Sequence, residues 1–73
     1  PVFSDDCEVL EQRIVGSGHS KLKLKVAGQT LDAIWFGRTD SLPRQACIAY
    51  KLEANEWRNA RNLQLMIEAV EGY

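Results

Sequence analysis

The sequence predicts an all-β protein, a single small five-stranded barrel with little or no helix. Apolar residues recur with a period of two rather than 3.6, which is typical of strands with one buried face. Runs of turn-forming residues separate these stretches. The chain has 73 residues, of which 45% are hydrophobic, so it can build one small core and no more. We therefore expect one domain over residues 1–73.

The strands are predicted from the alternation itself. The clearest run places apolar residues at Leu22, Leu24 and Val26 and lysines at Lys21, Lys23 and Lys25. Similar alternation predicts strands over residues 46–52 and 63–67. A first strand is expected over 9–15, with Gln12 and Arg13 facing water, and a further one over 30–36, which is rich in strand formers.

The connections are predicted from turn residues. Residues 16–19 link the first two strands, and residues 27–29 form a tight hairpin in which Gly28 can take a positive φ. Residues 37–44 are expected to form a loop with at most one helical turn, and residues 53–62 to form the last loop. A terminal helix over 55–70 is a weaker alternative, because the alternating leucines near its centre would spread around a helix. Five short strands suit an OB-fold or an SH3-like barrel.

Composition excludes several classes of protein. The net charge is -1 and the pI is near 5.7, which excludes a strongly basic nucleic-acid clamp. The tails are acidic, whereas residues 13–61 carry a charge of +5. Cys7 and Cys47 are too few for a disulfide framework or a structural zinc site and are expected to be reduced. No apolar run is long enough to span a membrane, and the acidic start does not fit a signal peptide.

An ordered set of motifs resembles one family. The set comprises Glu-Gln-Arg-Ile-Val-Gly at 11–16, His-Ser-Lys-Leu-Lys-Leu at 19–24, Leu-Asp-Ala-Ile-Trp-Phe at 31–36, Ala-Tyr-Lys-Leu at 49–52, Asn-Glu-Trp-Arg at 55–58 and Leu-Gln-Leu at 63–65. This succession is similar to the OB domain at the C-terminal side of the RecJ family of bacterial single-strand exonucleases. The sequence departs from the family pattern at Trp35, at Asn59 and in the short connector 37–44.

The resemblance implies a fragment excised from a longer enzyme. Family members are metal-dependent phosphoesterases of the DHH type that degrade single-stranded DNA from 5′ to 3′ in recombination and repair, so Mn or Mg is expected in the catalytic core of the parent. This chain has one His and no catalytic motif, and no cofactor or metal site is expected in it. The expected partners are single-stranded DNA, the rest of the parent exonuclease and a single-strand-binding protein, in the bacterial cytoplasm and not at a membrane.

The first set of candidate DNA-binding residues is the row His19, Lys21, Lys23 and Lys25. If the intervening leucines point into the barrel, these side chains point outward about 6–7 Å apart, a spacing close to that of phosphates along a strand. The alternative is a soluble strand face whose lysines protect an edge. The resemblance to an OB-fold favours DNA binding over a merely soluble strand face, because that fold binds oligonucleotides on its second and third strands.

The second set comprises Trp57, Arg58 and Arg61 in the last loop and Trp35 in the third strand. The arginines can stack on bases or grip phosphates, and Trp57 is either a base-stacking residue or a core plug. Both faces of the third strand are apolar; we expect Ile34 and Phe36 inside, which leaves Trp35 exposed for stacking or for contact with another domain.

Three functions therefore remain open. The first is a single-stranded-DNA-binding accessory domain of a RecJ-like exonuclease. The second is a structural module that packs on the catalytic core, and the third is a generic small barrel that binds a protein tail.

Overall fold

The computed structural model describes the backbone of residues 1–57 and 60–73 and the side chains of residues 1–54 and 62–73. The chain forms the strands β1 (Phe3–Val15), β2 (His19–Val26), β3 (Gln29–Trp35), β4 (Gln45–Trp57) and β5 (Ala60–Val70). No helix occurs in the described residues. The all-β prediction is confirmed, and the alternative of a terminal helix over 55–70 is wrong because β5 occupies most of that stretch.

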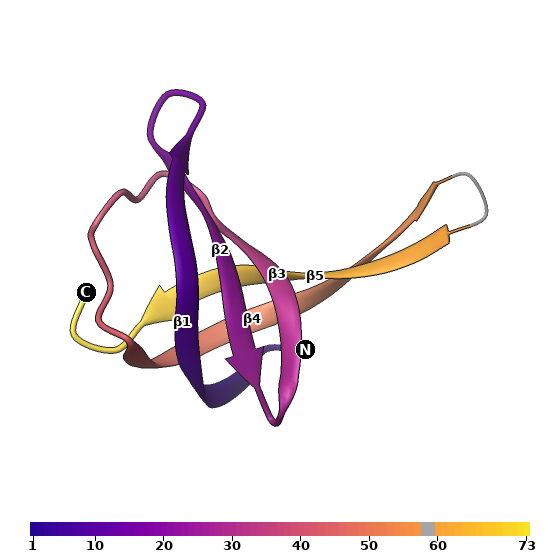
Figure 1. The fold of residues 1–73 in the computed structure, drawn as a ribbon, viewed down its shortest axis with the longest axis horizontal. Helices are drawn as coiled ribbons and strands as arrows, with labels where there is room; N and C mark the ends of the chain where they lie inside the picture. The colour runs from indigo at the N-terminus through magenta and orange to yellow at the C-terminus, as the bar shows by residue number, and fades with distance from the viewer. Residues whose placement is uncertain (58–59) are drawn as a thin grey trace.

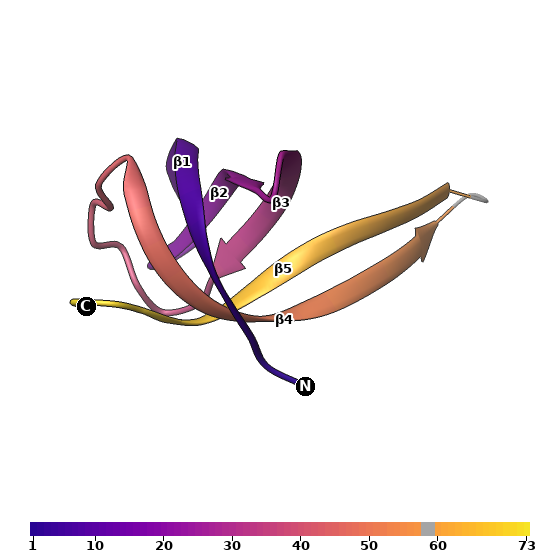
Figure 2. The same ribbon diagram turned by 90° about the horizontal axis from the view of Figure 1, so that it is seen from below.

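The five strands close into a barrel in the order β1-β2-β3-β5-β4 (Figures 1 and 2). The first half of β1 pairs with β4 and the second half with β2, with a register shift between Val9 and Glu11. A short parallel pairing of β3 with β5 closes the barrel, and all other pairs are antiparallel. This is the five-stranded barrel expected of an OB-fold.

The β4–β5 hairpin is longer than the sequence predicts. Residues 53–62 were expected to form a loop, yet pairing continues from Leu52 opposite Leu65 to Trp57 opposite Ala60. The distal part, here called the β4–β5 arm (residues 52–57 and 60–63), projects from the barrel (Figures 1 and 2). Its many polar residues suggested a loop, but a two-stranded ribbon exposes both faces to water, so polar residues do not prevent pairing.

The β2–β3 hairpin agrees with the prediction. Val26 pairs with Gln29, and the two residues between them have positive φ, 50° at Ala27 and 79° at Gly28. Two successive positive φ values define the type I′ turn that suits the twist of a two-residue hairpin. Gly28 takes this conformation at no steric cost.

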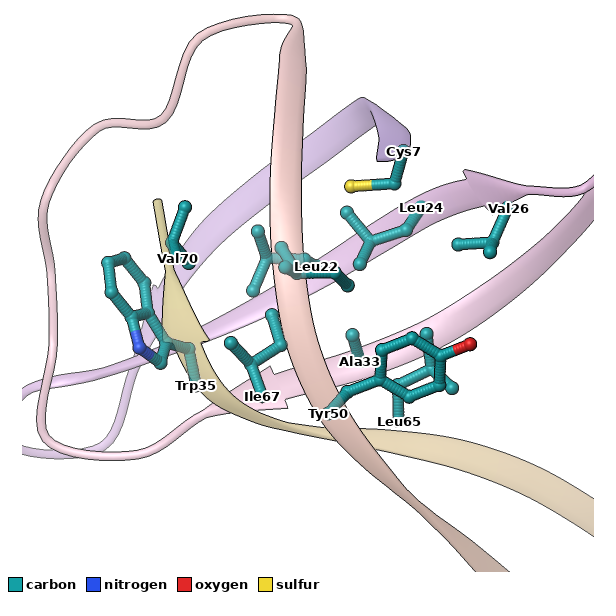
Figure 3. Packing of buried hydrophobic residues seen from close by; sticks show 11 residues of the cluster. Cys7, Leu22, Leu24, Val26, Ala33, Trp35, Tyr50, Leu65, Ile67 and Val70 are labelled. Carbon is teal, nitrogen blue, oxygen red and sulfur yellow. The ribbon is translucent and has the colours of Figure 1, made fainter. Parts of the chain in front are cut away.

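The core fills the barrel with side chains from all five strands (Figure 3). It contains Cys7, Leu22, Leu24, Val26, Ala33, Trp35, Ile48, Tyr50, Leu65, Ile67 and Val70. In β2 the predicted alternation is confirmed at every position from Ser20 to Val26.

The orientation predicted for β3 is wrong. Trp35 is 3% exposed, whereas Phe36 is 55% exposed and Ile34 is half-buried. The register places Ala33 beside the buried Leu22 and Leu65, and Trp35, two residues further along, faces the same interior. Arg38 lies over the indole at 4.9 Å, and the Tyr73 ring meets it edge-on at 6.4 Å.

The side chain of Gln12 holds the loop of residues 36–44 in place. The expectation that Gln12 faces water is therefore wrong. Its side-chain amide donates to the Asp40 carbonyl at 2.7 Å and to Ser20 Oγ at 3.3 Å, and it accepts from the Leu42 amide at 3.0 Å. Ser20, fully buried, donates to the Arg38 carbonyl at 2.8 Å. These bonds satisfy polar groups of a loop that has no regular secondary structure.

Tyr50 gives the fold a dependence on alkaline pH. Its hydroxyl donates to the Asp5 carboxylate at 2.6 Å, and this bond, with burial, raises the pKa of Tyr50 to about 12. An unfolded tyrosine loses its proton near pH 10, so between about pH 10 and 12 the folded state binds this proton more tightly. The free energy of unfolding should therefore fall through that window, by on the order of 2 kcal/mol. Urea unfolding at several pH values measures it, and Tyr50→Phe should remove this component; an identical decline in Tyr50→Phe would contradict the assignment.

Candidate nucleic-acid interface

The lysine row faces solvent as the sequence predicted. Lys21, Lys23 and Lys25 are exposed, and the residues between them are buried. The row runs along the outer surface of β2, at the centre of the β1-β2-β3 sheet, with about 6–7 Å between successive residues. We call the solvent-facing side of β2 and β3 the outer β2–β3 face.

Neighbouring strands place acidic residues beside two of the three lysines. Lys23 is paired with Glu11 of β1 and with Asp32 of β3, and Lys25 is paired with Glu8. Directly paired residues of antiparallel strands lie on the same face, so carboxylates share the lysine surface. The sequence interpretation missed them because the cross-strand register determines which residues are neighbours.

Lys21 has a different environment. Its partners are Arg13 of β1 and Ile34 of β3, so positive charge is concentrated at this end of the row. Arg13, Lys21 and Lys23 also line a shallow groove of about 210 Å³, together with Glu11, Leu22 and Asp32. The groove is therefore basic at one end and of mixed charge at the other. At the other end of the row, Glu8, the partner of Lys25, forms an ion pair with Arg44, whose Nη2 lies 2.9 Å from Glu8 Oε2.

An aromatic pair lies at the basic end. The rings of His19 and Phe36 meet edge to face, with centroids 5.3 Å apart and planes at 78°. His19 Nδ1 accepts a hydrogen bond from the Gly37 backbone amide at 2.8 Å. Phe36 is the exposed aromatic residue that the sequence interpretation missed, because two apolar faces on β3 gave no way to decide which one was buried.

The other predicted site residues are placed as follows. Trp35 lies in the core and offers no exposed ring for stacking, so that part of the prediction is wrong. Trp57 and Arg61 lie near the tip of the β4–β5 arm by their backbone positions, and their side chains lie outside the described residues. Arg58 lies outside them altogether. Their roles stay predictions.

Within the residues that the structure describes, no cluster of His, Cys, Asp or Glu has a metal-binding arrangement. Cys7 and Cys47 are free thiols. Burial raises the pKa of Cys7, and desolvation followed by the Asp6 and Glu71 carboxylates raises that of Cys47. Both shifts favour the unreactive thiol form. None of the described segments is a helix long and apolar enough to cross a membrane.

The closed barrel, with basic and aromatic side chains on its outer β2–β3 face, defines a small OB-fold domain. The family model described as "RecJ OB domain" matches residues 1–69. The chain therefore belongs to the RecJ OB-domain family.

Curated relatives agree with this assignment. The chain is similar to proteins named "Single-stranded-DNA-specific exonuclease RecJ" from three bacteria. The Haemophilus influenzae relative is 40% identical over 80 residues, a match that covers 97% of this chain and 14% of the relative. The Dickeya dadantii relative is 39% identical over 75 residues, covering 93% and 13%. The Escherichia coli relative is 35% identical over 77 residues, covering 96% and 13%. The chain thus spans about one seventh of the length of these relatives.

Proposed function

We propose that this chain is a single-stranded-DNA-binding accessory domain of a RecJ-type exonuclease. The observation that carries the proposal is the outer β2–β3 face, where exposed lysines of β2 and an exposed aromatic residue just after β3 lie along the strands that OB-folds use for oligonucleotides. The names of the relatives, which describe exonucleases specific for single-stranded DNA, support the same proposal.

Binding on this face is expected to be weak. Lys21, Lys23 and Arg13 attract phosphates, but Glu11 and Asp32 lie among them and repel. Such a surface guides a strand without clamping it, in agreement with the net charge of -1. The contribution of the domain is thus to hold a strand that another part of the parent cleaves.

The lysine row makes a prediction about salt. With about three phosphates neutralised, log affinity for oligo(dT) should fall with log salt at a slope near -2, at roughly -0.7 per contact. Replacing Lys21, Lys23 and Lys25 together by glutamine should weaken binding and flatten the slope. Fluorescence anisotropy with a labelled oligo(dT), started at low salt, measures both quantities.

Lys51→Gln is the matched control, because Lys51 is an exposed lysine on β4 that pairs with Glu68 at 3.3 Å. It should leave the slope unchanged. A salt-independent affinity, or an unaltered slope in the triple variant, would show that this row does not contact DNA.

A structural module that packs on the rest of the parent is the second candidate. The apolar face of the β4–β5 arm favours it: Leu52 and Leu63 are 49% and 48% exposed, and Phe3 is 41% exposed nearby on Tyr50. If the domain does not bind oligo(dT) even at low salt, this candidate becomes the leading one.

The proposal leaves cleavage to the remainder of the parent. The Mn or Mg cofactor, the 5′ to 3′ direction and the action in recombination and repair belong to that larger protein. The cytoplasmic location and the contact with a single-strand-binding protein are parts of the same proposal.

A further inference from the structure

We propose that Phe36, steadied by His19, is a stacking platform for one unpaired nucleobase, with Lys21 beside it to receive a neighbouring phosphate. This inference rests on the proposed function and assigns the contact that distinguishes single-stranded DNA from any other polyanion. It takes the place of Trp35, for which the sequence left stacking or contact with another domain open and which the structure places in the core.

Phe36 is held between two fixed points. On one side, Trp35 is buried and anchors the end of β3. On the other side, the Gly37 amide donates to His19 Nδ1 at 2.8 Å and joins the start of β2 to the residue after Phe36. A ring presented on fixed backbone loses little conformational entropy when a base stacks on it.

The His19 contact leaves the Phe36 ring accessible. An edge-to-face pair covers at most one face of the phenyl ring, and Phe36 remains 55% exposed. Because Nδ1 accepts the Gly37 hydrogen bond, the neutral imidazole carries its proton on Nε2. That N–H is a donor that can serve a phosphate oxygen next to a stacked base.

The surroundings suit a nucleotide. Ile34, two residues before Phe36, shares its face and is paired with Lys21, which has Arg13 on its other side. Lys21 and the platform are therefore separated by about one two-residue step, roughly 6–7 Å. A base in a duplex has both faces stacked, so only an unpaired base can use the platform.

Phe3 provides a matched control. It is also an exposed phenylalanine, at 41%, but it stacks on Tyr50 with centroids 5.7 Å apart, on the β1–β4 pair. The Tyr50 hydroxyl donates a hydrogen bond to the Asp5 carboxylate. Phe3 thus has the same side chain and similar exposure next to an acid, away from the outer β2–β3 face.

The test compares a dT oligomer with an abasic strand of equal length, which keeps the phosphates and lacks the bases. The parent sequence should prefer dT. Phe36→Ala should lose about 5- to 100-fold in affinity for dT and bind both strands alike, with an unchanged salt slope, since no charge is removed. Phe36→Trp should retain the preference for dT, Phe36→Leu should lose it, and Phe3→Ala should bind like the parent sequence.

The outcomes separate this inference from the proposed function. If the parent sequence binds dT and Phe36→Ala binds it equally well, the platform is disproved and DNA binding stands. Full retention by Phe36→Leu overturns stacking as well, because it shows that apolar area alone suffices. If the parent sequence binds neither strand, the proposed function fails and the platform fails with it. Thermal midpoints of all variants confirm that each compared protein is folded.

Discussion

Replacing Trp35 by alanine is expected to cost about 3–5 kcal/mol of folding free energy, the usual range for a buried tryptophan. A 73-residue domain has a total stability of about 4–11 kcal/mol, so the substitution removes a large share of it and, at the lower end of that range, unfolds much of the population at room temperature. The indole fills one end of the core beside Val70 (Figure 3) and also contacts Arg38 and Tyr73. Removing it leaves a cavity that the closed barrel can fill only in part. Urea unfolding monitored by far-UV circular dichroism measures the loss.

Phe36→Ala is the internal control for this experiment, since it removes an aromatic ring from the next residue on the exposed side. Its unfolding free energy should stay within about 1 kcal/mol of the parent value. Equal destabilisation by the two substitutions, or a Trp35→Ala protein as stable as the parent, would contradict the orientation of β3 described above.

Replacing Gln12 by alanine is expected to cost about 2–3 kcal/mol, because one side chain satisfies three groups. The Asp40 carbonyl, the Leu42 amide and Ser20 Oγ each lose a partner. Gln12→Glu keeps an acceptor for the Leu42 amide but turns a second acceptor toward the Asp40 carbonyl, so it should not restore the parent stability. Equilibrium unfolding gives the totals, and hydrogen exchange of the Leu42 amide should accelerate most in Gln12→Ala.

Arg13→Ala is the neighbouring control, since Arg13 is exposed and lies on the opposite face of β1. It should change stability by less than about 0.5 kcal/mol. Unaltered exchange at Leu42 in Gln12→Ala would mean that the loop of residues 36–44 is held by other contacts.

How far the sequence predicts this fold differs from strand to strand. In β2, lysines alternate with apolar residues from Lys21 to Val26, so one face had to be buried and the prediction was right. In β3, both faces are apolar, and the choice depended on pairing with Leu22 and Leu65, residues distant in sequence. Composition alone suggested a loop where the β4–β5 arm forms, because solvent-exposed strand pairing leaves no hydrophobic signature.

The candidate site shows the same division. The outward direction of Lys21, Lys23 and Lys25 followed from alternation within one strand. Their acidic neighbours could not be predicted in this way, because they depend on the register between strands. The exposure of Phe36 could not be predicted either, because it depends on which face of β3 is buried. A polar side chain such as Gln12 carries no local sign that it will fasten a loop 28 residues away.

The barrel is assembled from two pieces that are each continuous in sequence. Residues 3–35 form the β1-β2-β3 meander and residues 45–70 the β4–β5 hairpin, and the two meet at the seams between β1 and β4 and between β3 and β5. The basic and aromatic surface lies on the first piece, and the projecting arm lies on the second. Substitutions on one surface therefore need not disturb the other, so the two surfaces can evolve independently within a domain of 73 residues.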